Sequence, residues 1–168
     1  TGVHGTVYSI RDNPKLIVKQ QPLKYHHREV PVALYLSKKH VIPMIYNVYD
    51  GKRYGYIVQE RYDGTLGNIM DRKNPNISKT GNLSMKNRTK LKNAVRRFHR
   101  TGVVHLNMHA NNIVYKKTPR GLMFKVIDPG WAVKVKPTII GGPQVKRETE
   151  KLARKMFPSS PYNIGVAV

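Results

Sequence analysis

The sequence predicts a mixed α+β fold, in which an antiparallel sheet with one helix is followed by a second helix and a β-hairpin. Two observations predict the first part. Runs of β-branched and aromatic residues are separated by turn residues up to residue 60, and residues 25–39 interrupt them with helical spacing. A third observation predicts the second part, because the helical pattern of residues 84–100 precedes two short apolar runs joined by a turn.

The predicted sheet contains a short apolar strand at residues 15–20 and a β-hairpin made of residues 41–49 and 54–60. Asp50-Gly51 is the expected turn, since a D-G pair between apolar runs is a strong hairpin signal. These segments carry many of the tyrosines of the chain and are expected to form sheet core.

Residues 25–39 predict the first helix, with Val30, Ala33, Leu34 and Leu36 facing inward. Pro31 leaves its start open. Proline is tolerated in the first turn of a helix and is disruptive further in, so the helix begins either near residue 25 or near Pro31.

The second helix, residues 84–100, is expected to begin at a Ser84 cap and to end at Gly102. Its apolar stripe is formed by Leu91, Ala94, Val95 and Phe98. Basic residues surround this stripe, and we interpret them as a polyanion-binding face rather than a merely solvated one: Lys86, Arg88, Lys90, Lys92, Arg96, Arg97 and Arg100.

The whole chain is strongly basic, with 31 Lys and Arg against 9 Asp and Glu and a formal net charge of +22. Such an excess predicts a polyanionic partner: nucleic acid first, an acidic protein surface second, an anionic membrane third. Cysteine is absent, which excludes disulfides and thiolate metal sites. No run of apolar residues is long enough for a membrane span.

The most informative stretch is residues 103–114, where an apolar pair leads into a polar loop and then into a strand. The hairpin that follows is expected to bring Asn112 near Asp128. An amide carbonyl and a carboxylate are hard oxygen ligands suited to Mg²⁺ beside phosphates. The plain alternative is an ordinary β-hairpin with polar turns.

This stretch resembles the catalytic loop of protein kinases, H-R-D-x-x-x-x-N, followed by D-F-G. His105 falls on the His of the motif, Asn112 on its metal-binding Asn, and Asp128 on the Asp of D-F-G. The catalytic Asp, however, is replaced by Asn107, and an amide has no useful basicity at neutral pH. The resemblance therefore implies a kinase-like α+β fold with degenerate catalytic-loop positions and no catalysis.

Other segments resemble kinase elements in the same order along the chain. The opening residues are similar to the later part of the Gly-rich loop, residues 15–20 to the strand that carries the phosphate-binding lysine, and residues 60–66 to the hinge that carries adenine. The implied vestigial nucleotide-binding positions are Gly2, Gly5, Val7, Lys19, Glu29, Glu60 and Tyr62. No cofactor is expected, and Mg-ATP is the cofactor only if this vestigial site works.

The resemblance covers residues 1–133, and residues 134–168 are expected to form a basic C-terminal extension. Residues 139–143, I-I-G-G-P, resemble the site cut by adenovirus-type maturation proteases, although an ordinary glycine turn is the alternative. Since the chain also begins at Thr1 without an initiator Met, we expect that it starts at a cut. These features predict a component of a virus particle with capsid proteins among its partners, located in the virion or the nucleus and without a secretion signal.

The function expected from the sequence is thus a catalytically inactive kinase-like domain that acts as a basic structural or scaffold protein and binds a polyanion. Two alternatives stay open. One is a divergent Ser/Thr-type protein kinase, because phosphoryl transfer depends mostly on positioning and charge. The other is a pseudokinase that binds a nucleotide as a switch.

Overall fold

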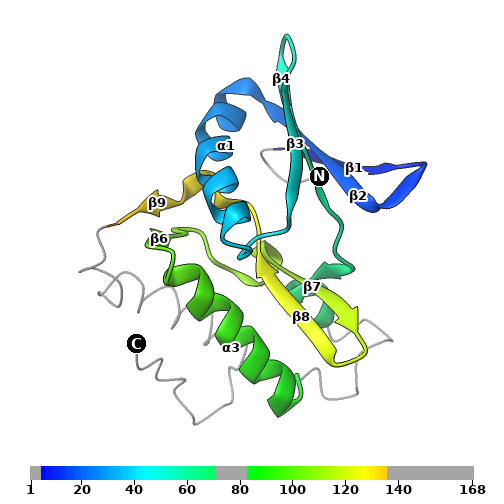
Figure 1. Ribbon diagram of the computed structural model, residues 1–168, viewed down its shortest axis with the longest axis vertical. Helices are drawn as coiled ribbons and strands as arrows, with labels where there is room; N and C mark the ends of the chain where they lie inside the picture. The colour runs from blue at the N-terminus through cyan, green and yellow to red at the C-terminus, as the bar shows by residue number, and fades with distance from the viewer. Residues whose placement is uncertain (1–4, 71–82, 136–168) are drawn as a thin grey trace.

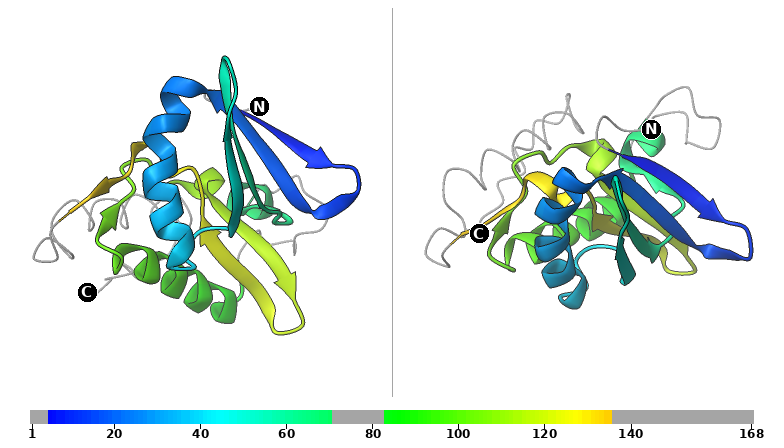
Figure 2. Two further views of the ribbon diagram at one scale, coloured as in Figure 1. Left: turned by 45° about the horizontal axis from the view of Figure 1, so that its top comes forward. Right: turned by 90° about the horizontal axis from the view of Figure 1, so that it is seen from above.

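The computed structural model describes residues 5–70 and 83–135, which form two stacked parts (Figure 1). The first part is a four-stranded antiparallel sheet in the order β1-β2-β4-β3, with helix α1 against one face (Figure 2). Its elements are β1 (Thr6–Ile10), β2 (Asn13–Pro22), α1 (Leu23–Lys38), β3 (Ile45–Asp50) and β4 (Tyr54–Glu60).

The β3–β4 hairpin turns later than the D-G pair predicts. The Gly51 N–H donates to the carbonyl of Tyr54 over 2.8 Å, so the two residues between them, Lys52 and Arg53, form the tip. Asp50 remains in the strand, where it pairs with Gly55, and its carboxylate lies 2.8 Å from the imidazole of His27 on α1. Contact with the helix therefore decides the position of the turn.

Helix α1 begins at Leu23, directly after Pro22, and runs through Pro31. The first of the two starting points considered is thus correct, and a start near Pro31 is wrong. Pro31 is exposed, so the carbonyl four residues earlier, which lacks an amide partner, lies on the side of α1 that water reaches. The first N–H of the helix, that of Leu23, donates to the carbonyl of Arg53 over 3.3 Å.

The buried face of α1 is more polar than the apolar pattern predicts. Ala33 and Leu36 are buried as expected, but Leu34 is exposed, because the face turned to the sheet also carries His26 and Glu29. That rotation brings Glu29 to the strand β2, which matters for the site described below.

The second part combines a three-stranded sheet, in the order β5-β7-β8, with helix α3 packed along β8. A short ladder joins β6 to β9. The elements are β5 (Gly64–Thr65), α2 (Leu66–Met70), α3 (Met85–His99), β6 (Val103–Val104), the 3₁₀ turn η1 (Ala110–Asn112), β7 (Ile113–Thr118), β8 (Gly121–Val126), the 3₁₀ turn η2 (Pro129–Trp131) and β9 (Val133–Lys134).

The predicted cap, end and apolar stripe of the second helix are confirmed. The Ser84 side chain accepts the N–H of Asn87 and caps α3, and Gly102 ends the helical region with a φ of 79°. The predicted apolar stripe of α3 is buried, and Phe98 is wholly inaccessible. It forms one core with Ala33 and Leu36 of α1 and with residues of β7 and β8, so the two parts share a hydrophobic centre.

The structure is therefore a mixed α+β arrangement of antiparallel sheets with few helices. None of the helices in the described ranges is long and apolar enough to cross a membrane. A boundary after residue 133 would fall inside β9, which pairs with β6. Gly2, the I-I-G-G-P motif and nearly all of the predicted C-terminal extension lie outside the described residues.

Candidate functional site

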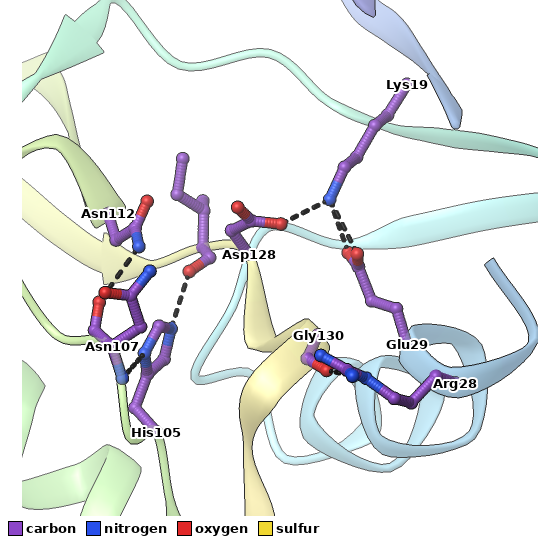
Figure 3. Close-up of polar contacts among 9 residues, drawn as sticks. Lys19, Arg28, Glu29, His105, Asn107, Asn112, Asp128 and Gly130 are labelled. Carbon is purple, nitrogen blue, oxygen red and sulfur yellow. Dashed lines mark hydrogen bonds and ion pairs between the residues drawn. The ribbon is translucent and has the colours of Figure 1, made fainter. Parts of the chain in front are cut away.

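Three charged side chains from distant parts of the chain meet where the two parts of the molecule join (Figure 3). The Lys19 ammonium, on β2, donates to both carboxylate oxygens of Glu29 on α1, each over 2.7 Å. It also donates to the carboxylate of Asp128, after β8, over 2.6 Å. The uninterrupted path of α1 through Pro31 brings Lys19 and Glu29 together.

Burial and charge act against each other in this cluster. Burial alone would lower the pKa of Lys19, but Glu29 and Asp128 hold it above the ordinary 10.5. Burial raises the pKa of Glu29 above 4.5, with the charge of Asp128 adding to the effect and Lys19 opposing it. One ammonium thus serves two carboxylates, and with both ionised the cluster carries a net negative charge.

Backbone contacts hold Asp128 in place. Its φ of 58° and ψ of 56° lie in the left-handed region, directly before Pro129 opens η2. The preceding residue, Ile127, donates its N–H to the carbonyl of Asn112 over 2.9 Å. The carbonyl of Ile127 lies 2.8 Å from Nε2 of His105. This turn therefore aims the Asp128 side chain at Lys19.

The polar loop before β7 is ordered by His105, whose side chain is fully buried. Nδ1 of His105 accepts the N–H of Asn107 over 3.3 Å, so Nε2 carries the proton that is donated to Ile127. The amide nitrogen of Asn112 donates to the backbone carbonyl of Asn107 over 3.0 Å. This bond leaves the Asn112 amide oxygen as the atom available to a cation (Figure 3).

Asn112 and Asp128 are the residues that could hold Mg²⁺, as oxygen ligands beside a negatively charged cluster. Within residues 5–70 and 83–135, no three His, Asp or Glu side chains group in a way that could hold a metal ion. Any Mg²⁺ at this place would take its remaining ligands from water or from the phosphates of a bound nucleotide.

The other predicted nucleotide-binding positions surround this cluster unevenly. Val7 is exposed and pairs with Lys19 across β1 and β2. A side chain at Gly5 would meet the carbonyl of Gln20 at 2.7 Å, so close backbone approach requires glycine there. Gly5 directly precedes β1 and Val7 lies within it, at the place where the sequence predicts the Gly-rich loop.

At the end of β4, Glu60 turns its carboxylate to the second sheet. It accepts from Lys116 over 2.9 Å and lies 3.9 Å from Lys125. Both ammonium groups also lie within 6 Å of the ring centre of Tyr62. Burial, with the charge of Glu60 adding to it, raises the pKa of the Tyr62 hydroxyl. This charged cluster joins the two parts of the molecule next to the place predicted for adenine.

The sequence does not single out Lys116 and Lys125, although the predicted hairpin contains the signal. Val114 pairs with Lys125 and Lys116 with Met123, so strand alternation puts both lysines on one face of the hairpin.

A second feature missed from the sequence links α1 to η2. The Arg28 guanidinium donates to the carbonyl of Gly130 over 2.5 Å and lies 3.9 Å from the ring centre of Trp131. No local pattern marks this contact, because it joins residues that are far apart in the chain.

The predicted basic face of α3 is divided by the fold. Four of its members border a groove of about 650 Å³ between α3 and β8: Lys90, Arg96, Arg97 and Arg100. The opposite side of the groove belongs to the β7–β8 hairpin and is formed by the apolar residues Leu122, Met123 and Phe124 together with Thr118. The other members, Lys86, Arg88 and Lys92, do not line it, and Arg88 donates to the carbonyl of Leu83 over 2.9 Å.

A comparison with models of known protein families finds none that matches this chain.

Proposed function

We propose that this chain is a catalytically inactive kinase-like domain that serves as a basic structural or scaffold protein and binds a polyanion, either nucleic acid or an acidic protein surface. The kinase-like part of the proposal is supported by the order of the motifs and by the meeting of Lys19, Glu29 and Asp128. Asn112 and His105, which come from the same motif, lie beside this cluster.

The lack of catalysis follows from Asn107. In kinases a carboxylate at this place accepts the proton of the substrate hydroxyl, and an amide cannot do so at neutral pH. The backbone of Asn107 is held by His105 and Asn112, so the position is ordered and only its chemistry differs.

The groove between α3 and β8 is the observation that supports the proposed binding of a polyanion. It gathers four cations, and none of the described residues that line it is acidic. Together with the net charge of +22, this concentrates positive charge at one concave place.

A binding titration tests this function. Fluorescent DNA and a fluorescent polyglutamate are each titrated with the protein at several salt concentrations between about 50 and 200 mM. For DNA, log K should fall linearly with log salt, by about 0.9 per duplex phosphate contacted. Binding of neither polyanion at the lowest salt would overturn the proposal.

Catalysis is tested by transfer of labelled γ-phosphate to basic and acidic protein substrates, with Mg²⁺ or Mn²⁺. We expect no transfer by the wild type. Asn107→Asp restores a carboxylate at this position, and its transfer activity is compared with that of the wild type. Wild-type transfer that Asp128→Ala abolishes would instead support the divergent Ser/Thr-type kinase.

The Lys19–Glu29 contact favours a second candidate, a pseudokinase that binds a nucleotide as a switch. In this candidate Lys19 would leave Asp128 for a phosphate, while Asp128 and Asn112 would hold Mg²⁺. A binder at 100 times its dissociation constant gains about 2.7 kcal/mol of stability. A Mg-ATP-dependent rise in melting temperature that Lys19→Ala abolishes would establish this candidate, and equal melting with and without Mg-ATP would exclude it.

A further inference from the structure

The groove between α3 and β8 has two chemically different sides. Lys90 and Arg97 of α3 and its C-cap residue Arg100 recur at spacings of seven and three residues, which places them along one face of the helix. At 1.5 Å per residue they span about 15 Å. Arg97 and Arg100 are exposed, and Lys90 donates to the carbonyl of Arg120 at the end of the β7–β8 turn.

The other side is formed by β8, where Leu122 and Met123 are half-buried and Phe124 is buried. The Leu122 N–H donates to the side chain of Asn87 on α3 over 3.3 Å, which ties the strand to the helix at one end of the groove. A ligand in this groove therefore meets cations along one side and an apolar surface along the other.

These two sides discriminate between polyanions. Duplex DNA presents only its charged backbone to a protein surface, unless an element enters one of its grooves. Leu122 would then face phosphates without gaining a contact. A single strand exposes both parts at once, because its bases are free to leave the stack and lie on apolar side chains.

The arginines fit the same ligand. A guanidinium binds phosphate through two parallel hydrogen bonds, and a phosphodiester chain repeats its charge at every nucleotide. Lys90, Arg97 and Arg100 can therefore each bind a different phosphate of the same strand. A peptide could do the same only if its acidic and apolar side chains matched both sides of the groove.

We propose that the α3–β8 groove is a binding site for single-stranded nucleic acid, with the backbone phosphates on Lys90, Arg97 and Arg100 and a base on Leu122. This inference rests on the proposed polyanion-binding function and names the ligand class and the residues that take it.

The test uses the full chain and fluorescence anisotropy with three probes: an oligo-dT strand, a duplex of equal length, and an abasic strand of equal charge. The groove variant Arg97→Gln/Arg100→Gln is compared with Lys24→Gln/Lys38→Gln, which removes the same charge from exposed positions of helix α1. Glutamine keeps the helix propensity, and melting curves confirm that each variant folds. If the melting curve shows that the groove variant does not fold, Arg100→Gln alone takes its place.

We expect the oligo-dT strand to bind more tightly than both the duplex and the abasic strand. The slope of log K against log salt should fall by about 1.4 in the groove variant, or 0.7 for each lost phosphate contact, and stay unchanged in the control variant. Leu122→Thr should reduce the preference for oligo-dT over the abasic strand and leave the salt slope as it is.

Three results would overturn the inference while the proposed function stands. The first is binding of the duplex at least as tight as that of the single strand, and the second is an equal loss of slope in both double variants, which would indicate diffuse charge. Binding of polyglutamate without binding of any nucleic acid would also overturn it and leave an acidic protein surface as the partner. Failure to bind any of these polyanions would remove the proposed function as well.

Discussion

At the scale of single residues, Lys19 holds the two parts of the molecule together electrostatically. Its ammonium lies between a buried carboxylate from α1 and a partly exposed one after β8, with side-chain exposures of 6% for Glu29 and 39% for Asp128. The buried partner depends on Lys19 much more than the exposed one does, because water can solvate Asp128 but hardly reaches Glu29.

Replacing Lys19 by Met should therefore be costly at neutral pH. It leaves Glu29 buried beside a second carboxylate, and breaking such a pair costs about 3–5 kcal/mol. In Lys19→Met/Glu29→Leu no uncompensated charge remains, so much of the loss should be recovered. Urea unfolding of both variants measures this. A double variant as unstable as the single one would show that Glu29 is not the origin of the cost.

The raised pKa of Glu29 gives a pH dependence with a definite sign. Below its ordinary pKa of 4.5 the group is protonated in both the folded and unfolded states, and its contribution to stability is fully present. As pH rises through the higher folded pKa, that contribution is lost. Glu29→Gln cannot ionise, so its stability relative to wild type should increase as pH rises from about 4 to 7. Parallel wild-type and variant curves from urea unfolding across this range would contradict the expectation.

At the scale of elements, helix α1 carries the site. Its sheet-facing side holds Glu29, and its exposed side holds Pro31 and Arg28. The helix tolerates the proline because packing of Ala33 and Leu36 beyond it outweighs one lost backbone hydrogen bond. Pro31 should therefore lower the stability of the protein by an amount that a substitution can measure.

Pro31→Ala should stabilise the protein, because it restores the N–H and removes the clash of the ring with the preceding turn. The expected gain is about 1–3 kcal/mol, below the full interior penalty since the site is exposed and proline also restricts the unfolded chain. Lys24→Ala in the same helix is the control and should change stability by less than about 0.5 kcal/mol. Thermal unfolding followed by circular dichroism compares them. A lower melting temperature for Pro31→Ala would show that the ring makes contacts of its own.

The contact of Arg28 with η2 has a built-in probe, since Trp131 is the single tryptophan of the chain. Arg28→Ala should shift the emission of Trp131 and cost about 1 kcal/mol. Arg28→Lys keeps the charge but lacks the flat guanidinium that stacks on the ring, so its emission should resemble that of Arg28→Ala. Unchanged emission in both variants would show that the stacked arrangement is not populated in solution.

At the scale of the whole molecule, the dominant property is charge. With a formal net charge of +22, the folded chain repels itself more than the expanded chain does. Local ion pairs such as those of Lys19 and Glu60 use up several of the few acids, so they relieve this repulsion only in part.

Simple salt should therefore stabilise the free protein. Raising ionic strength from about 10 to 150 mM shortens the screening length from about 30 to about 8 Å and weakens the repulsion between distant cations. The melting temperature should rise over this range, equally with NaCl and KCl. A fall would mean that the attractive ion pairs outweigh the repulsion.

Much of the fold could be predicted because its signals are local. The Ser84 cap, the Gly102 end and the apolar stripe of α3 depend on neighbours within a few residues, and so does the β7–β8 turn at Gly121 with its φ of 98°. The signals that misled are those with a competing long-range partner. Asp50-Gly51 is a turn signal, but the contact of Asp50 with His27 keeps it in the strand. Leu34 fits an apolar helix face, but the sheet selects the face that carries Glu29.

The same division applies to the site. The sequence by itself determined which chemical groups are present, including an amide at Asn107 where the kinase resemblance expects a carboxylate, and how much positive charge the chain carries. Only the tertiary structure decided that Lys19 serves Glu29 and Asp128 together, and that part of the basic face of α3 closes on β8 as a groove. The chemical group at each position follows directly from the sequence. The distance between side chains a hundred residues apart depends instead on how helices and sheets pack, and this packing involves the whole core.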